Sequence, residues 1–177
     1  MSVDLLDLYR RTGAWTSQIV AGATDLTAAT PCEEWTVRDL LNHMLDTQRY
    51  FAGSARGEDV SPPGPNPPDL LGNDPAADVE RTQTDVISAF SKEGAIDKTG
   101  PALGIAFSDL LLHSWDLARA TGHDDTMPAG LAEASYDVIH GKFTDEQRKQ
   151  IFKPEVDVGA DASAQDRLLG YTGRTPA

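Results

Sequence analysis

Apolar residues recur at helical spacing along most of this chain, and Pro and Gly residues interrupt the pattern at intervals. A spacing of three and four residues places apolar side chains on one face of a helix. No convincing run of alternating β-branched residues, the pattern typical of strands, is present. The sequence therefore predicts an all-α fold. The segments expected to be helical are about 3–21, 36–53, 75–93, 104–121, 128–140, 144–151 and 163–172.

Several of these segments begin with residues that cap helices. Ser2 is a candidate N-cap of the first segment, and Thr36–Asp39 has the spacing of a capping box. Asp74–Pro75 has the favoured order of a cap followed by proline. Thr144–Gln147 and Ser163–Asp166 open the last two segments in the same way as the second. Four longer helices followed by short ones predict a bundle with additional short C-terminal helices.

Residues 54–74 contain five prolines, a density that neither a helix nor a sheet interior tolerates. We expect a long surface loop there. The sequence contains no internal repeat, and 177 residues with 40% hydrophobic content fit a single globular domain. We therefore expect one helical-bundle domain over residues 1–177.

Charge and cysteine content exclude several kinds of partner. The chain has 15 Lys and Arg residues against 28 Asp and Glu, a formal net charge of -13, whereas a nucleic-acid groove needs clustered basic residues. No segment approaches the ~20 apolar residues of a membrane span, and the N-terminus lacks a signal pattern. Cys32 is the only cysteine, which is typical of a reducing compartment. We expect a cytoplasmic protein with no nucleic-acid or membrane partner.

Asp109 and His113 are separated by four residues in a leucine-rich helical segment, so both side chains lie on one helix face, one turn apart. A carboxylate at the edge of an apolar core needs a cation, a hydrogen-bond network or water, because burying it alone costs several kcal/mol. His43, on the second amphipathic segment, is the third candidate. Two imidazoles and a carboxylate match the ligand count of a catalytic metal site with open positions. We predict a divalent-metal site, zinc or nickel, at His43, Asp109 and His113.

Asp116 lies one turn beyond His113 and has two interpretations. It accepts the second imidazole N–H of a metal ligand, or it pairs with Arg119, three residues further on. The ion pair with Arg119 is the simpler expectation.

Other candidate residues have structural interpretations. His123 lies in a turn, and His140 lies at a helix end, where an imidazolium complements the helix dipole. Cys32 has no motif of a catalytic thiol, and we expect a small buried packing residue. Trp35 and Trp115 are expected to be core or staple residues rather than platforms for a ligand.

Two segments of the sequence, TPCEEWTVRDLLNH at 30–43 and HSWDLARATG at 113–122, look like the signature segments of one family. They resemble actinobacterial metal-binding proteins related to the N-terminal domain of mycothiol-dependent maleylpyruvate isomerase, in the DinB-like superfamily. The segment ADASAQDRLLG at 160–170 is similar to the C-terminal end of that group. The resemblance covers almost the whole chain.

The resemblance implies a DinB-like four-helix bundle with a divalent metal held by a histidine of the second helix and an acid–histidine pair of a later one. These positions fall on His43, Asp109 and His113. The family acid is usually Glu, so the shorter Asp109 is a departure that bears on metal affinity. True maleylpyruvate isomerases carry a fused C-terminal domain that completes the substrate site, and we expect this chain, without one, to lack that specific activity.

Three functions follow from these expectations. The first is a thiol-dependent S-transferase or isomerase that acts on a small electrophile, with a low-molecular-weight thiol such as mycothiol as cofactor. The second is a non-catalytic metal-binding or small-molecule-binding protein, for example in stress response. The third is a helical interaction module in which the polar residues of 104–121 form only a hydrogen-bond network. A homodimer through an exposed helix face is a further expectation.

Overall fold

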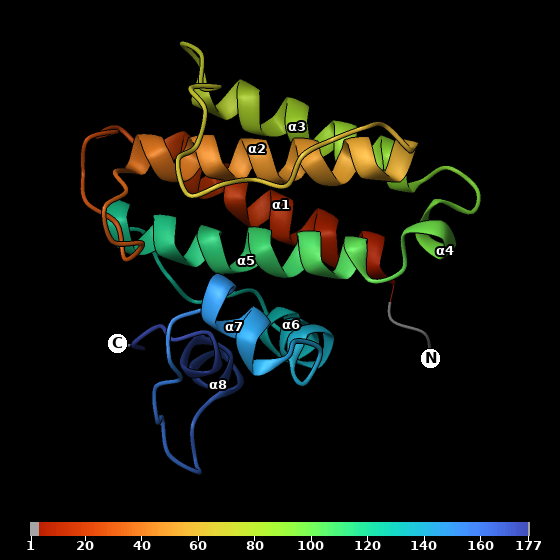
Figure 1. Cartoon of the computed structure of the whole chain (residues 1–177). Coiled ribbons are helices and arrows are strands. Elements are labelled where there is room, and N and C mark those ends of the chain that lie inside the picture. Colours follow the sequence, from red (N-terminus) through yellow and green to blue (C-terminus); the bar gives the residue numbers. More distant parts are fainter. Residues whose placement is uncertain (1–3, 177) are drawn as a thin grey trace. The chain divides into compact units, whose positions relative to one another are not determined.

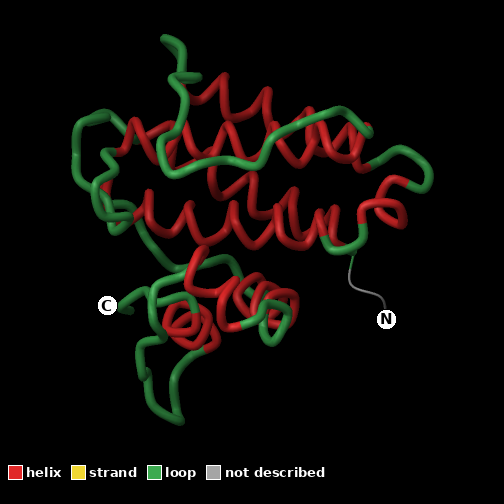
Figure 2. Tube along the Cα trace, in the orientation of Figure 1, coloured by secondary structure: helices red, strands yellow, loops and turns green. Residues whose placement is uncertain are grey.

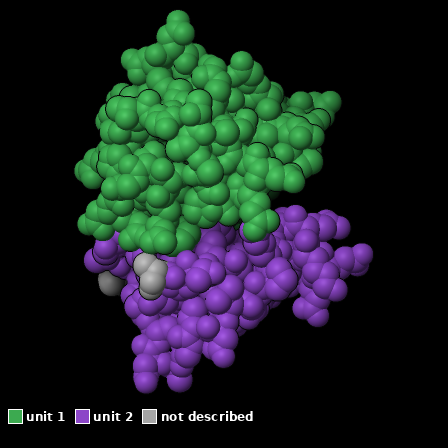
Figure 3. Space-filling view, turned by 90° about the vertical axis from the view of Figure 1, so that its left-hand side faces the viewer, with its two compact units in different colours: residues 1–125 green, residues 126–177 purple. Residues whose placement is uncertain are grey.

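The computed structural model of this protein describes residues 4–176. All its secondary-structure elements in that range are helices (Figures 1 and 2). Eight helices and no strand occur in that range, so the expected all-α class is confirmed. The chain divides into two compact units, residues 1–125 and residues 126–177 (Figure 3). The expectation of a single domain stays a prediction, and each unit is described by itself below.

The first unit is a four-helix bundle with one short extra helix. Helices α1, α3, α2 and α5 follow one another around the bundle, since α1 packs on α3 and α5, and α2 packs on α3 and α5 (Figure 1). Large side chains such as Tyr9, Leu40, Phe107 and Leu110 are fully buried between them. The helices are α1 (Leu5–Gly22), α2 (Val37–Arg56), α3 (Pro75–Phe90), α4 (Ala95–Thr99) and α5 (Ala102–Thr121).

Capping residues explain where the long helices begin. The Asp4 carboxylate caps α1 by accepting from the backbone N–H groups of its first turn. The expected cap Ser2 and the expected first residue Val3 lie outside the described residues. Thr36 and Asp39 form the expected capping box of α2. Asp74 caps α3, whose first residue is Pro75, also as expected.

Several other helix bounds differ from the expected ones. α2 continues to Arg56 and ends at Gly57, which has φ 76, so the loop begins three residues later than position 54. α3 ends at Phe90 instead of reaching Gly94, and the five-residue helix α4 follows. α5 begins at Ala102, two residues before the expected start. These ends carry little periodic signal, because one or two turns hold too few residues to define a face.

The proline-rich loop of residues 57–74 runs along α2 and is held to the first two turns of the helix (Figure 1). The side-chain oxygen of Asn42 accepts hydrogen bonds from the backbone N–H groups of Leu70 and Leu71, each at 2.8 Å. Arg38 pairs with Asp69 at 3.3 Å. Asn42 precedes His43, so the loop is attached to the helix next to a candidate ligand.

The second unit contains three short helices, α6 (Leu131–Ile139), α7 (Asp145–Ile151) and α8 (Ala164–Tyr171). α6 packs on α8. Thr144 and Ser163 cap α7 and α8 as expected. The Arg148 guanidinium lies 4.1 Å from the ring centre of Tyr171 and donates to its carbonyl oxygen. None of the helices in residues 4–176 combines the length and apolarity that crossing a membrane requires.

Candidate metal centre

α2 and α5 bring the three predicted ligands together. His43 comes from α2, and Asp109 and His113 come from one face of α5, where a spacing of four residues aligns them. His113 Nε2 lies 3.5 Å from Asp109 Oδ1, and His43 Nε2 lies 4.0 Å from the same oxygen. One ligand atom from each residue lies within 4.8 Å of the other two. Positions far apart in the sequence therefore form one cluster.

The cluster leaves polar atoms without partners. The side chains are only 14% (His43), 23% (Asp109) and 13% (His113) exposed. Asp109 Oδ2 and His43 Nδ1 are buried and have no hydrogen-bond partner among the described residues. A buried carboxylate oxygen without a donor is costly, typically by about 1–3 kcal/mol. A cation bound to the carboxylate of Asp109 would offset this cost.

The distances also suit a metal ion. Ligands at 2.0–2.2 Å from a tetrahedral zinc ion lie about 3.3–3.6 Å from one another. The separation of His113 and Asp109 is in this range, and the separation of His43 and Asp109 exceeds it by about half an ångström. The residues present therefore fit a divalent cation with three protein ligands.

Asp116 fixes the orientation of His113. Its carboxylate oxygen Oδ2 lies 3.0 Å from His113 Nδ1, and the side chain is 1% exposed. A carboxylate that accepts the N–H of a ligating histidine leaves the other ring nitrogen to face the metal. Our simpler expectation, in which Arg119 is the partner of Asp116, does not describe this contact, and Arg119 pairs with Asp125 at 3.0 Å. The interpretation of Asp116 as an acceptor for a ligand is the one that the geometry favours.

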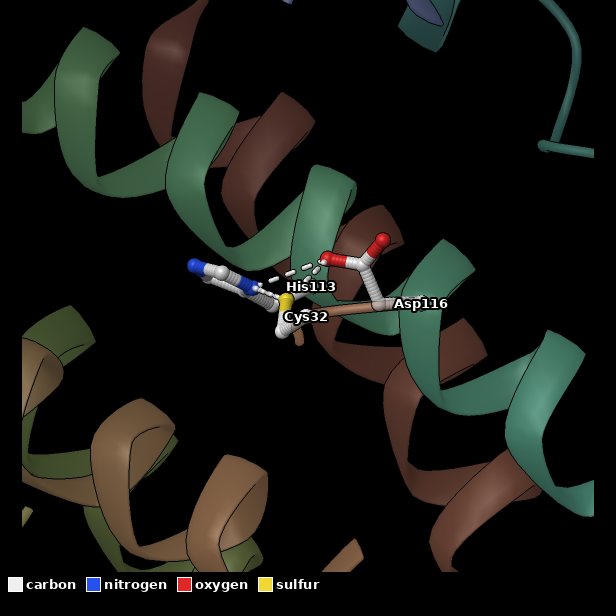
Figure 4. A group of neighbouring side chains, drawn as sticks. All are labelled: Cys32, His113 and Asp116. Carbon is white, nitrogen blue, oxygen red and sulfur yellow. Dashed lines mark hydrogen bonds and ion pairs between the residues drawn. The ribbon is translucent and has the colours of Figure 1, made fainter. Parts of the chain in front are cut away.

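Cys32 is a third member of this hydrogen-bonded group (Figure 4). Its Sγ lies 3.2 Å from Asp116 Oδ2 and 3.8 Å from His113 Nδ1, and the residue is only half-buried. The expectation of a small buried packing residue is therefore wrong. The loop before α2 folds back through an isolated bridge between Ala29 and Thr36, which brings the thiol to α5.

Trp35 covers the other histidine. Its ring centre lies 4.6 Å from that of His43, and its indole Nε1–H donates to the carbonyl oxygen of Pro65 at 3.2 Å. Trp35 is half-buried, so the expectation of a core or staple residue misses its contact with the site. Trp115, in contrast, is buried in the core as expected. The proline-rich loop thus reaches the candidate centre through Trp35.

Comparison with known proteins identifies the family. The family model described as mycothiol maleylpyruvate isomerase N-terminal domain matches residues 9–118, more than half of the chain. The chain belongs to this family. The three candidate ligands, together with Cys32 and Asp116, lie inside the matched range.

Two mycobacterial proteins are similar to this chain over most of its length. Uncharacterized proteins from two strains of Mycobacterium tuberculosis are each 27% identical to this chain over 167 residues. The alignment covers 86% of this chain and 87% of each relative. No solved structure matches the chain. The family assignment therefore rests on the isomerase-domain model.

Electrostatics at this isomerase-family centre separate the two histidines. Burial, helped by the nearby His113, lowers the pKa of His43 to about 4, although Asp109 and Asp116 act in the opposite direction. Burial also opposes a charge on His113, but the carboxylate of Asp109 and the contacts with Asp116 and Cys32 outweigh it. They raise the pKa of His113 to about 10. The carboxylates thus attract one positive charge, which the ring of His113 carries when no cation is bound.

The residues that sequence reasoning missed lie next to those that it found. Cys32 and Trp35 fall inside the signature segment 30–43, and Asp116 falls inside 113–122. The signature segments were the sequence signal that could have identified these residues. Helical spacing could not, because it does not describe a loop. The remaining histidines are placed as expected: His123 contacts the Thr121 hydroxyl at 2.8 Å, and exposed His140 ends α6.

Proposed function

We propose that this protein binds one divalent cation at His43, Asp109 and His113. The observation that carries the proposal is the meeting of both imidazoles at Oδ1 of Asp109, a carboxylate whose other oxygen, Oδ2, is buried and has no hydrogen-bond partner among the described residues. Two imidazoles and one carboxylate suit zinc or nickel. Two carboxylates, of Asp109 and Asp116, also balance the charge of a divalent ion, so neutral imidazole ligands complete an uncharged centre.

We further propose that the centre serves the chemistry of a low-molecular-weight thiol in the cytoplasm. A divalent cation, when bound, lowers the pKa of a coordinated thiol and so supplies a strong nucleophile at neutral pH. The family is described by a mycothiol-dependent isomerase, which supports mycothiol or a similar thiol as the cofactor. The reaction is S-transfer to a small electrophile or its isomerisation.

The residues of the chain have separate roles in this proposal. Asp116 accepts the Nδ1–H of His113 and keeps its Nε2 turned toward Asp109. Trp35 shields one face of His43 from water. The three ligand side chains keep between 13% and 23% of their surface exposed, so an incoming thiol and its electrophile have access.

Elemental analysis followed by an activity assay tests the proposal. Protein purified without a metal-affinity tag is expected to contain about one zinc or nickel ion per chain. The metal-loaded protein is then expected to conjugate or isomerise members of a panel of small electrophiles in the presence of mycothiol or a surrogate thiol. Absence of stoichiometric metal contradicts the whole proposal. Metal without any thiol-dependent activity contradicts the enzymatic part and leaves a non-catalytic metal-binding protein.

A further inference from the structure

His113 belongs to two groups of side chains that could ligate a metal, and the proposed function involves only one of these groups. The second group consists of Cys32, His113 and Asp116, which also offer ligand atoms within 4.8 Å of one another. Figure 4 shows the thiol, the imidazole and the carboxylate pointing toward a common point. The second group differs from the first in its ligand chemistry, because it contains a thiol, that of the single cysteine in the chain.

The two groups meet different nitrogens of the same ring. His113 Nε2 is 3.5 Å from Asp109, whereas His113 Nδ1 is 3.0 Å from Asp116. A neutral imidazole has a proton on one nitrogen and a lone pair on the other. His113 can therefore serve only one of the two groups as a neutral ligand at any time.

Asp116 supplies the negative charge of the second group. Its side chain is 1% exposed, and its Oδ2 lies 3.0 Å from His113 Nδ1 and 3.2 Å from Cys32 Sγ, so a cation bound there would take the place of the positive charge on the ring. Cys32, whose Sγ lies 3.2 Å from Asp116 Oδ2, is half-buried. Thiolate sulfur selects soft cations, whereas the imidazoles and carboxylate of the first group suit borderline ions.

We propose that Cys32, His113 Nδ1 and Asp116 form a second cation site, which takes thiophilic ions such as Cd²⁺ and excludes occupancy of the first site. On binding, the Cys32 thiol and the Nδ1–H of the charged His113 ring each lose a proton to solvent, and a sulfur–metal bond forms. The remaining proton of the His113 ring lies on Nε2, and Nδ1 donates its lone pair to the ion. This second site goes beyond the proposed thiol chemistry. Only the expectation that the two sites cannot be occupied together rests on the first site.

Cadmium binding to the full-length metal-free protein, kept reduced with a phosphine, tests this inference. Because the chain has one cysteine, an ultraviolet thiolate-to-cadmium absorption band reports on Cys32 alone. The wild-type protein is expected to show this band at one equivalent of Cd²⁺. Cys32→Ser is expected to lose it and to bind Cd²⁺ at least about tenfold more weakly. Zn²⁺ added in excess is expected to reduce the band, since both ions need His113.

A variant of the first site provides the matched comparison. His43→Ala removes a ligand that the second group does not use, so it is expected to weaken Zn²⁺ binding more than Cd²⁺ binding and to retain the band. Cys32→Ser is expected to do the reverse, weakening Cd²⁺ binding more than Zn²⁺ binding. If His43→Ala weakens Zn²⁺ binding no more than Cd²⁺ binding, the first site is contradicted and the second site is not.

Two results overturn the inference. One is a wild-type protein that shows no thiolate band at saturating Cd²⁺, and the other is Cys32→Ser with unchanged Cd²⁺ affinity. In either case the thiol is only a hydrogen-bond donor to Asp116. Should Cys32→Ser fail to fold, alkylation of wild-type Cys32 followed by mass spectrometry gives the same decision. Bound Cd²⁺ is expected to slow the alkylation at least about tenfold, and an unchanged rate contradicts the site.

Discussion

His113 is the residue on which the chemistry of this protein depends, because both of its ring nitrogens face carboxylates. Asp109 lies on the Nε2 side at 3.5 Å, and Asp116 lies on the Nδ1 side at 3.0 Å. The position of its proton decides which nitrogen carries a lone pair. A change at His113 therefore affects every function proposed above.

Replacement of His113 by alanine is expected to remove the bound metal. His113→Ala takes away one of three protein ligands, and metal content should fall from about one ion per chain to nearly none. His140→Ala is the matched control, since His140 lies exposed at the end of α6 in the other unit. Elemental analysis of the two variants checks the prediction. Equal metal content in both would show that the centre lies elsewhere.

Asp109 is the position at which the resemblance noted in the sequence implies a glutamate. Its Oδ1 is 4.0 Å from His43 Nε2, and one more methylene would let the carboxylate approach that nitrogen. Asp109→Glu is therefore expected to bind Zn²⁺ as tightly as the wild type or more tightly. Asp109→Asn keeps the size and loses the charge, so its Zn²⁺ dissociation constant should rise at least about tenfold. Titration calorimetry measures both, and equal affinity of Asp109→Asn and the wild type contradicts the ligand role.

Residue-level prediction from the sequence succeeded where helical spacing applied. Asp109 and His113 are four residues apart on a helix, and their alignment follows from the helical repeat alone. Cys32 and Trp35 lie in a loop, where Glu34 adopts a left-handed conformation with φ 72. No periodic rule describes such a backbone, so their contacts with the centre required the folded structure.

At the scale of elements, α2 carries one ligand and depends on its cap for a defined beginning. The Thr36 hydroxyl and the Asp39 carboxylate form the capping box, with Asp39 accepting from the backbone N–H of Thr36 at 2.9 Å. His43 follows two turns after the cap. The register of α2 at its start therefore sets where the imidazole meets α5.

Loss of this cap is expected to destabilise the bundle measurably. Thr36→Ala removes the acceptor for the Asp39 backbone N–H, which typically lowers the free energy of unfolding by about 1 kcal/mol. Thr84→Ala is the control, because Thr84 is exposed in the middle of α3 and its hydroxyl bonds only to a carbonyl of its own helix. Urea unfolding followed by circular dichroism compares them. A loss for Thr84→Ala as large as that for Thr36→Ala would contradict the importance of the cap.

The sequence predicted seven of these elements by their faces and caps, and it missed α4. That helix has five residues between Gly94 and Gly100, too short to show a repeat. The start of α5 at Ala102 was also placed two residues late, because Pro101 was interpreted as part of a loop. Both misses lie at glycine and proline positions, where the local backbone decides the structure more than burial does.

At the scale of the whole molecule, a bound ion links the site to stability. Any ligand that binds only the folded chain shifts unfolding, by about 2.7 kcal/mol at a free concentration of 100 times the dissociation constant. For a chain of this size the melting temperature is then expected to rise by about 5–10 °C. Thermal scans with Zn²⁺ and with a chelator measure the difference. His113→Ala should show no Zn²⁺ effect, and a wild-type protein that melts at the same temperature in both buffers contradicts the centre.

The fold class was predictable from the sequence as a whole, whereas the division of the chain was not. Apolar periodicity is summed over many turns, so the all-α class is insensitive to errors at single residues. The boundary between residues 125 and 126 follows a histidine- and aspartate-containing turn with no linker composition. Contacts far apart in the sequence define the two units, and a single sequence does not reveal them.

The indole of Trp35 gives the protein a built-in optical probe. Its ring lies 4.6 Å from the imidazole of His43 and 6.4 Å from that of His113, whereas Trp115 is buried in the core. A quenching ion such as Co²⁺ at the histidines would lie close enough to dim its fluorescence. Occupancy can then be followed in real time in the unlabelled chain, and Trp35→Phe identifies the source of the signal. The ring that shields the centre also makes its filling visible.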